Sequence, residues 1–429
     1  MKGRKVCALV LLMCFLLLVG CNKKEQSSEE GSKERIQFWI AENFEGEGEK
    51  YQKIVDEYNK KHADVLVEFS VKPWDKTPLN VALQSQEPPD VVSSWFSPPP
   101  DAYQNLRVNL LDYLTEAEKE DFGPQIIAKA TKEGGKMYTW PYYTSQGTWI
   151  LANGDILKKT GVAPEGLQEN GWKWEEFVTL CKRVKQVGAY GYGDAQSTDT
   201  LNLLYAGLLG PVIFDKDGKL TFNWGDKRAT AILENYYNLI YKDQVMPQEV
   251  LGVDIFGLHN KFTNGQFGII RSYSAWISQL EKDGKISKVY VLPYPDQIGL
   301  KMETDVGLGG FNIFKKPNAS EERIEKIIDF VRYLSRPHAG EFIPMQWIGL
   351  PAAESIRNSY ISSLEIDDPN LKFMITKING GRILPPDPSV AAKIREIIAT
   401  YSSEAMSKKI NPQQAITRWT KEIANLLRK

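Results

Sequence analysis

The sequence contains few of the residues from which metal centres and disulfide frameworks are built. Only 4 of its 429 residues are cysteine and 3 are histidine, and the histidines are far apart in the chain. This scatter argues against a His-rich metal site, so we expect neither a metal nor a cofactor. The 53 lysines and arginines are balanced by 54 aspartates and glutamates, so no basic excess points to nucleic acid.

Long hydrophobic runs are also absent, except at the N-terminus. Residues 7–19 form an apolar run behind Lys2, Arg4 and Lys5. A membrane-spanning helix needs about 20 residues to cross about 30 Å of hydrocarbon, and this run is too short. It predicts a secretory signal peptide over residues 1–20.

The end of the apolar run and the two residues after it read LVGC, at residues 18–21. This site is similar to the bacterial lipobox, in which the cysteine is acylated and becomes the mature N-terminus. We expect lipidation at Cys21, a polar tether over residues 21–34, and a location on the extracytoplasmic face of the bacterial cell membrane. An ordinary signal peptide with an incidental cysteine is the alternative.

The remaining cysteine, Cys181, lies on an apolar stripe with Phe177, Val178 and Val184 at helical spacing. Such a position predicts a small buried hydrophobic residue. Cys7 and Cys14 leave with the signal peptide, so we expect no intramolecular disulfide.

Aromatic residues, in contrast, are abundant: 11 Trp, 19 Tyr and 17 Phe. Flat apolar faces with polar tips suit an amphipathic ligand such as a sugar. A chain of this length, 42% hydrophobic and 25% charged, predicts a globular protein of two lobes.

Hydrophobic periodicity predicts an α/β fold. Strand, helix and strand alternate from residue 36, which favours a parallel sheet with crossover helices. An Asp-Gly pair between two apolar runs predicts a hairpin near residue 217 rather than a calcium loop. Further helices are expected over residues 51–58, 174–187, 226–242 and 320–334, and from Asn411 and Pro412 onward.

Catalytic signatures are missing. The sequence has no Gly-x-Ser-x-Gly elbow, no phosphate-binding Gly-x-x-x-x-Gly-Lys loop and no His-Glu-x-x-His pair. A glycosidase needs only two placed carboxylates, so a secreted carbohydrate-active enzyme remains the enzymatic alternative.

Several segments, in order, resemble the extracellular solute-binding lipoproteins of bacterial ABC importers, in the large sugar-binding family that includes maltodextrin-binding proteins. The segments are IQFWI at 36–40, PPDVV at 88–92, GKMYTWPY at 135–142, WKWEEF at 172–177, FTNGQFGII at 262–270, VLPYP at 291–295, GLGGFNIF at 307–314 and GLPA at 349–352. The segment at 150–162 departs from the family pattern, because Ala152 replaces a tyrosine and Gly154 a lysine.

The resemblance implies a two-lobed periplasmic-binding-protein-like fold, each lobe a mostly parallel sheet flanked by helices. Residues 35–140 plus 311–349 would form lobe 1, and residues 141–310 plus 350–429 lobe 2. Three crossovers would join the lobes near residues 140–142, 309–310 and 349–351, with the ligand between them.

The resemblance, and the C-terminal ends of strands in open α/β sheets, also indicate ligand-binding candidates. Aromatic faces would stack on sugar rings and polar groups would bind hydroxyls. The candidates are Glu42 and Asn43 after the first strand; Trp95 after the PDV strand; Tyr142, Tyr143 and Gln146 at the first crossover; Asp194 and Asp199 in a loop of lobe 2; Arg271, Tyr273 and Trp276 after the F-x-x-G strand; Gly309, Gly310 and Phe311 at the second crossover; and Trp347 near the third.

Some candidates have structural alternatives. Trp39 lies inside an apolar strand and is expected in the core, so it is not a candidate. Trp95 is bracketed by serines and prolines, as in an exposed loop. Tyr273 or Trp276 could be a core residue, and the two aspartates could be solvated loop acids.

The resemblance therefore implies a non-enzymatic, monomeric substrate-binding lipoprotein that delivers a carbohydrate to ABC permease subunits while a lipid anchor holds it at the membrane. A ligand-sensing lipoprotein that signals to a membrane kinase is the non-enzymatic alternative. Genes for permeases or for a kinase beside this one would distinguish the two.

Overall fold

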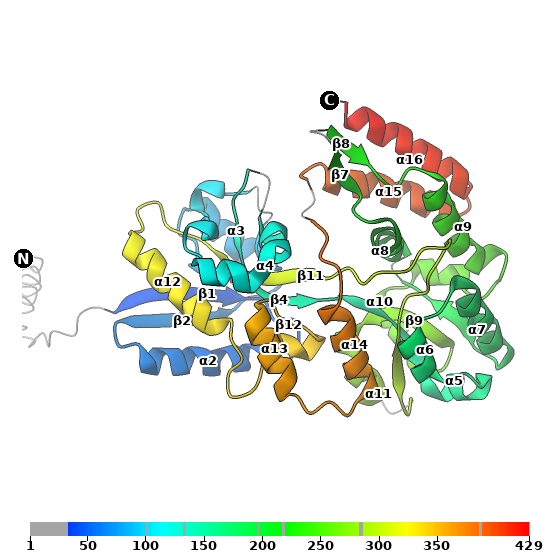
Figure 1. The fold of residues 1–429 in the computed structure, drawn as a ribbon, viewed down its shortest axis with the longest axis horizontal. Coiled ribbons are helices and arrows are strands. Elements are labelled where there is room, and N and C mark those ends of the chain that lie inside the picture. The colour runs from blue at the N-terminus through cyan, green and yellow to red at the C-terminus, as the bar shows by residue number, and fades with distance from the viewer. Residues whose placement is uncertain are drawn as a thin grey trace, which may run out of the picture.

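The computed structural model of the chain describes residues 33–98, 102–131, 134–195, 197–216, 219–282, 286–385 and 388–428. Two sheets with their covering helices form two lobes that lie side by side (Figure 1). The predicted signal peptide, Cys21 and all but the last two residues of the predicted tether lie outside the described residues.

The sheet of lobe 1 has six strands in the order β12-β4-β11-β3-β1-β2. Strand β1 is parallel to β2 and β3, whereas β11 is antiparallel to β3 and β4, and β12 is antiparallel to β4. The bounds are β1 Glu34–Ile40, β2 Val65–Val71, β3 Val91–Ser93, β4 Thr139–Ser145, β11 Gly307–Ile313 and β12 Leu350–Pro351.

The sheet of lobe 2 has four strands in the order β10-β5-β9-β6, and only β6 and β9 are parallel. The bounds are β5 Thr148–Asn153, β6 Tyr190–Gly193, β9 Phe267–Tyr273 and β10 Val289–Leu292. The predicted two-lobed α/β fold is confirmed, but the expectation of mostly parallel sheets is wrong. The chain enters and leaves the lobes on neighbouring strands, and strands that carry the chain in opposite directions must pair antiparallel.

Helices surround both sheets. In lobe 1 they are α2 Glu47–Lys61, α3 Thr77–Gln84, α4 Glu116–Ala130, α12 Glu321–Leu334 and α13 Glu354–Ser363. In lobe 2 they are α5 Gly154–Thr160, α6 Pro164–Asn170, α7 Trp174–Gln186, α8 Ser197–Leu209, α9 Lys227–Tyr241, α10 Ile255–Thr263, α11 Ile277–Lys282, α14 Pro369–Asn379, α15 Ala391–Met406 and α16 Pro412–Leu426. The short 3-10 helices are η1 Gln104–Leu106, η2 Leu110–Asp112, η3 Gln248–Gly252, η4 Ser274–Trp276 and η5 Ile343–Trp347.

The predicted helix starts are confirmed at their caps. The Asn411 side chain accepts a hydrogen bond from the backbone of Gln414, whose own side chain accepts from the backbone of Asn411. The side-chain oxygens of Asp226 and Ser320 accept hydrogen bonds from backbone N–H groups in the first turns of α9 and α12. Each cap satisfies backbone N–H groups that a helix start leaves unpaired. Such a cap contributes about 1 kcal/mol to the free energy of unfolding.

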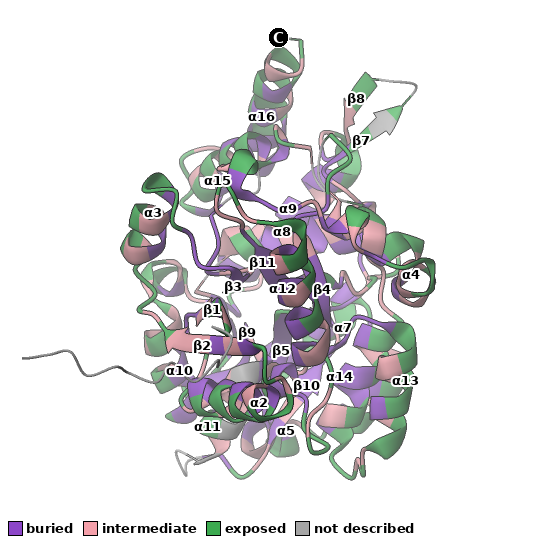
Figure 2. Ribbon diagram, turned by 90° about the vertical axis from the view of Figure 1, so that its left-hand side faces the viewer, coloured by how far each residue is buried: buried purple, intermediate pink, exposed green. Residues whose placement is uncertain are grey.

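Hydrophobic burial holds each lobe together, and buried residues line the inner sides of strands and helices (Figure 2). In lobe 2, Trp419 of α16 donates its indole N–H to the carbonyl of Trp224, and Trp224 packs on Tyr205 of α8. Cys181 is fully buried, as predicted, and the predicted hairpin is formed by β7 Ile213–Lys216 and β8 Lys219–Phe222.

The C-terminal segment is shared between the cores. Tyr360 of α13 packs on Phe342, and both belong to the hydrophobic cluster of lobe 1. Helices α14, α15 and α16 contribute to the cluster of lobe 2. The lobe boundaries expected from the sequence stay a prediction.

Candidate functional site

Four aromatic side chains meet at the C-terminal edge of the lobe 1 sheet. Phe44 follows β1, Trp95 follows β3, Tyr143 lies on β4 and Trp347 ends η5. Their ring centroids are 5.8 Å apart for Phe44 and Trp347, 5.9 Å for Trp95 and Trp347, 5.4 Å for Tyr143 and Trp347, and 5.8 Å for Trp95 and Tyr143. These are ordinary aromatic contact distances. We call these four residues the lobe 1 aromatic cluster.

Three members of the lobe 1 aromatic cluster, Phe44, Trp95 and Trp347, are only half-buried. The structure therefore brings together three sequence candidates, Trp95, Tyr143 and Trp347, from segments far apart in the chain. Phe44 was missed, although its place shortly after the first strand, beside Glu42 and Asn43, could have indicated it. Half-buried rings held by their neighbours can offer a face to a ligand.

The first two candidates, Glu42 and Asn43, hold the start of α2. A Glu42 carboxylate oxygen accepts from the Gly48 backbone N–H at 2.7 Å, and Asn43 donates from its backbone to Glu47 at 2.5 Å. A side chain at Gly48 would lie 2.5 Å from Val71 and 2.8 Å from the Glu42 carboxylate, so glycine permits this close approach.

Glu47 is a buried carboxyl that the sequence analysis did not single out. Burial raises its pKa to about 7, and the hydrogen bonds from Asn43 oppose that rise. Burial raises the pKa of Tyr143, and the Glu47 charge contributes to that rise. A carboxyl that changes charge near neutral pH thus starts α2, three residues after Phe44 of the lobe 1 aromatic cluster.

The crossover candidates Tyr142 and Phe311 are packed inside lobe 1. Their rings are stacked with centroids 4.8 Å apart, and both side chains are fully buried. Gly309 and Gly310 lie on β11 where its register with β4 shifts. A side chain at Gly309 would overlap the Tyr143 ring, so this glycine makes room for a member of the lobe 1 aromatic cluster.

In lobe 2, the candidates Asp194 and Arg271 belong to one buried polar group. The Asp194 carboxylate accepts hydrogen bonds from the hydroxyls of Tyr236 and Tyr192. Burial, followed by the Asp194 charge, raises the pKa of both phenols well above the usual value, so they remain neutral donors. Burial alone would lower the pKa of Arg271, but electrostatic interactions with Tyr294 and Asp194 outweigh burial and raise it.

The other lobe 2 candidates differ in exposure. Asp199 is exposed in the first turn of α8, while Tyr273 and Trp276 are half-buried. The Trp276 ring packs on Phe256 at 5.4 Å and on His259 at 4.9 Å. Phe256 is 59% exposed and was not a candidate. Lobe 2 therefore also carries an accessible aromatic pair.

Gln146 lies in the turn between β4 and β5. Its side chain is buried and donates to the Thr148 carbonyl at 2.8 Å. Within the described residues its side-chain oxygen has no hydrogen-bond partner, and it lines a small cavity of about 30 Å³ beside Trp149 and Tyr294. Such a cavity is large enough for about one water molecule.

One hydrogen bond joins the two aromatic groups. The Ser274 hydroxyl in η4 of lobe 2 donates to the Trp347 carbonyl in η5 at 2.9 Å. The segments that carry Trp276 and Trp347 are therefore neighbours across the lobes. The structure brings together candidates from both lobes at this point, but it leaves Tyr142, Phe311 and the Asp194 group buried.

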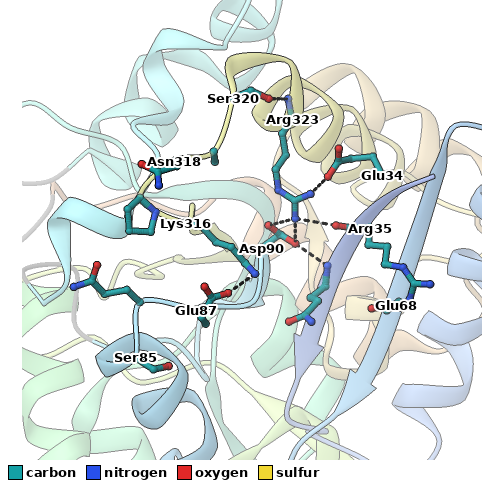
Figure 3. A pocket seen from close by; sticks show the side chains of 14 residues that line it. Glu34, Arg35, Glu68, Ser85, Glu87, Asp90, Lys316, Asn318, Ser320 and Arg323 are labelled. Atoms are coloured by element: carbon teal, nitrogen blue, oxygen red, sulfur yellow. Dashed lines mark hydrogen bonds and ion pairs between the residues drawn. The ribbon is translucent and has the colours of Figure 1, made fainter. Parts of the chain in front are cut away.

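A pocket of about 820 Å³ lies elsewhere (Figure 3). It is at the N-terminal end of β1, near Glu34 and Arg35, opposite the edge that carries the lobe 1 aromatic cluster. Its charged groups are paired with each other, as Asp90 is with Arg323 and Lys316 with Glu87. These ion pairs bind α12 and its loop to the sheet, which is a structural role.

The described residues contain neither a membrane-spanning helix nor a metal-binding cluster. In residues 33–428, leaving aside the undescribed gaps, no helix has both the length and the apolar character needed to cross a membrane. Over the same ranges, no group of three or more His, Cys, Asp or Glu side chains could hold a metal ion.

Comparison with known proteins identifies a family whose sequence model matches the chain and solved structures that share its fold. The sequence model of a family described as bacterial extracellular solute-binding protein matches residues 41–340. The cyclic alpha-maltosyl-1,6-maltose binding protein from Arthrobacter globiformis superposes with a TM-score of 0.72 at 17% identity, over 92% of this chain and 99% of that one.

Two other solved structures have the same fold. Maltose-bound MalE3 from T. maritima superposes with a TM-score of 0.64 at 22% identity, over 91% of this chain and 100% of that one. An ABC transporter solute-binding protein from Thermotoga lettingae, bound with alpha-D-tagatose, superposes with a TM-score of 0.66 at 18% identity, over 92% of this chain and 100% of that one.

Proposed function

We propose, from the premise that the chain belongs to the family of bacterial extracellular solute-binding proteins, that it captures a carbohydrate between its lobes for an ABC importer. The observation that carries the proposal is the lobe 1 aromatic cluster, whose half-buried rings lie at the C-terminal edge of the sheet beside η4 of lobe 2. Similar folds bind maltose and tagatose, which supports a sugar as the ligand.

The proposed mechanism is capture followed by closure, with no chemistry on the ligand. A ligand that touches both lobes stabilises the closed arrangement by its differential affinity for that arrangement. Strands β4, β11 and β12 lie side by side and carry the predicted crossovers, so rotation of lobe 2 would be absorbed where these strands end. The closed form would then be presented to the permease subunits.

A thermal-shift screen tests the proposal. The purified protein, without its signal peptide, would be melted with glucose, maltose, maltotriose, xylobiose, tagatose and, as controls, amino acids and dipeptides. A sugar at 100 times its dissociation constant should stabilise the folded state by about 2.7 kcal/mol. Stabilisation by an amino acid or a peptide, with none by any sugar, would contradict the proposal.

Trp95→Ala should weaken binding of that sugar about tenfold with little loss of stability. The ring is half-buried, contacts the rings of Tyr143 and Trp347, and donates its indole N–H to the Ala41 carbonyl at 3.4 Å. Loss of a stacking contact of about 1.4 kcal/mol corresponds to a tenfold change in affinity. Isothermal titration and melting on the same sample measure both quantities.

Trp172→Ala is the matched control for this experiment. Trp172 is a buried residue of lobe 2 that packs on Phe177, so its loss should lower stability by about 3–5 kcal/mol and leave sugar affinity unchanged. If Trp95→Ala behaves like Trp172→Ala, Trp95 is a core residue and not a ligand contact.

The family places the protein outside the cytoplasm, and we propose that a lipid on Cys21 anchors it to the membrane. One acyl chain gives only marginal attachment, so the cysteine would carry more than one. Cys21→Ala should release the protein into the medium or leave the signal peptide attached. Unchanged processing and membrane retention would contradict the anchor.

A further inference from the structure

Trp74 is an exposed tryptophan at the edge of the candidate site. It follows β2, and its side chain is 52% exposed, whereas every other described tryptophan is buried or half-buried. Because β1, β2 and β3 are parallel, their C-terminal ends meet at one edge of the sheet. Trp74 therefore lies at the same edge as the lobe 1 aromatic cluster, although it was not a sequence candidate.

Trp74 and Trp95 bracket the segment that follows β1. The Trp74 indole N–H donates to the Glu42 carbonyl at 2.6 Å, and the Trp95 indole N–H donates to the carbonyl of the preceding residue, Ala41, at 3.4 Å. Trp95 comes from the β3 side of β1 and Trp74 from the β2 side. Two strand spacings separate β3 from β2, which is about 10 Å along the edge.

The Trp74 loop is held in place by contacts on both sides. The Lys72 backbone N–H donates to the Ile40 carbonyl at 2.7 Å, and the Lys76 ammonium donates to the Ser97 carbonyl at 3.2 Å. The Asp75 carboxylate accepts from the backbone and the hydroxyl of Thr77, which starts α3. Lys72 also lies 4.1 Å above the ring of Trp39, which is half-buried rather than in the core as expected.

A large apolar side chain that is fixed but not covered loses the stabilisation that burial would provide. The Trp74 indole N–H already donates to the Glu42 carbonyl, so the part of the side chain that is left free is the aromatic ring. A fixed ring costs little conformational entropy on binding, which favours a stacking contact. The ring suits the apolar face of a sugar better than a charged or strongly polar group.

We infer that Trp74 is a second, outer stacking platform, and that the ligand is an oligosaccharide that extends from the lobe 1 aromatic cluster across the β1 segment to β2. The inference rests on the proposed function. Because Trp95 and Trp74 lie on opposite sides of the β1 segment, an oligosaccharide that crosses this segment would contact them with different sugar rings. Trp74 thus increases the affinity for longer glycans and is not needed for the capture of the shortest ligand.

The test measures affinity against chain length. Wild-type protein, Trp74→Ala and Trp74→Phe would be titrated with maltooligosaccharides and with xylooligosaccharides from the monosaccharide to the hexasaccharide. Trp74→Ala should bind the longest binding glycan about three- to tenfold more weakly, with unchanged affinity for the shortest one that binds. Trp74→Phe keeps a ring and should retain most of the affinity for long chains.

Tyr190→Ala is the matched control, because Tyr190 is 41% exposed at the N-terminal end of β6, away from the site. Tyr190→Ala should leave the affinity for every glycan in the length series unchanged.

If wild-type protein binds no glycan, the proposed function fails and the inference fails with it. If glycans bind but Trp74→Ala weakens all lengths equally, or none, Trp74 is not a length-selecting platform while the proposed function stands. If Trp74→Ala also melts lower, the length profile of Trp74→Phe against wild type decides.

Discussion

Asp90→Ala should lower the free energy of unfolding by about 3 kcal/mol. The Asp90 carboxylate is 2% exposed, and one Arg323 nitrogen lies 2.9 Å from each of its oxygens. It also accepts from the Gln37 backbone N–H of β1 at 2.8 Å. Removing one partner of a buried pair leaves the other uncompensated, at a cost of about 3–5 kcal/mol. The lower end is expected because Glu34 still pairs with Arg323.

Urea unfolding at neutral pH measures this difference, and Glu116→Ala provides the control. Glu116 pairs with Lys119 at 2.7 Å, but its side chain is 84% exposed. An exposed pair of this kind contributes about 0–1 kcal/mol. Equal, small effects of the two substitutions would show that the Asp90 pair does not hold α12 to the sheet.

The second large effect is expected at the crossover. Gly310→Ala should destabilise the protein by about 3 kcal/mol or more, because an added methyl group would overlap the Trp140 carbonyl oxygen on β4. The two strands pair here with a shift in register, so the backbone cannot yield without breaking the β4–β11 pairing. Melting temperature should fall, and sugar affinity should fall with it if the predicted crossover at this strand positions the two lobes.

Gly307→Ala on the same strand separates this steric effect from a general effect of alanine. A methyl group at Gly307 would lie 3.4 Å from the nearest atom, the Ser145 carbonyl oxygen, which is ordinary contact. Gly307→Ala should leave stability within about 0.5 kcal/mol of wild type. A Gly310→Ala variant as stable as Gly307→Ala would show that the β4–β11 pair is not constrained at the crossover.

The two substitutions, at Asp90 and Gly310, test different features of lobe 1: the ion pair that holds α12 to the sheet, and the close pairing of β4 and β11. The Asp90 pair and its neighbours keep lobe 1 rigid, at the end of the sheet far from the lobe 1 aromatic cluster. Gly310 lets β4 and β11 approach closely within the lobe 1 sheet, at the position of the predicted second crossover. In the proposed closure, rigid lobes and compact hinges together would let a ligand shift the population toward the closed form.

The sequence by itself determined most of the local structure. The spacing of Tyr51, Ile54 and Tyr58 predicts α2 because residues three and four apart share one face of a helix, and all three are buried. Asn411 and Pro412 predict the start of α16 because the cap side chain and the fixed φ of proline act within one turn. These effects depend on near neighbours in the chain, which a sequence displays directly.

Only the tertiary structure decided which side chains meet. Trp95, Tyr143 and Trp347 come from segments up to about 250 residues apart, and their contact depends on the order of β3, β4 and β12 in one sheet. The mixed direction of the strands, the burial of Glu47 and the exposure of Trp74 were likewise not predictable. Each depends on packing between segments that are distant in sequence, and strand order and burial are set by the fold as a whole.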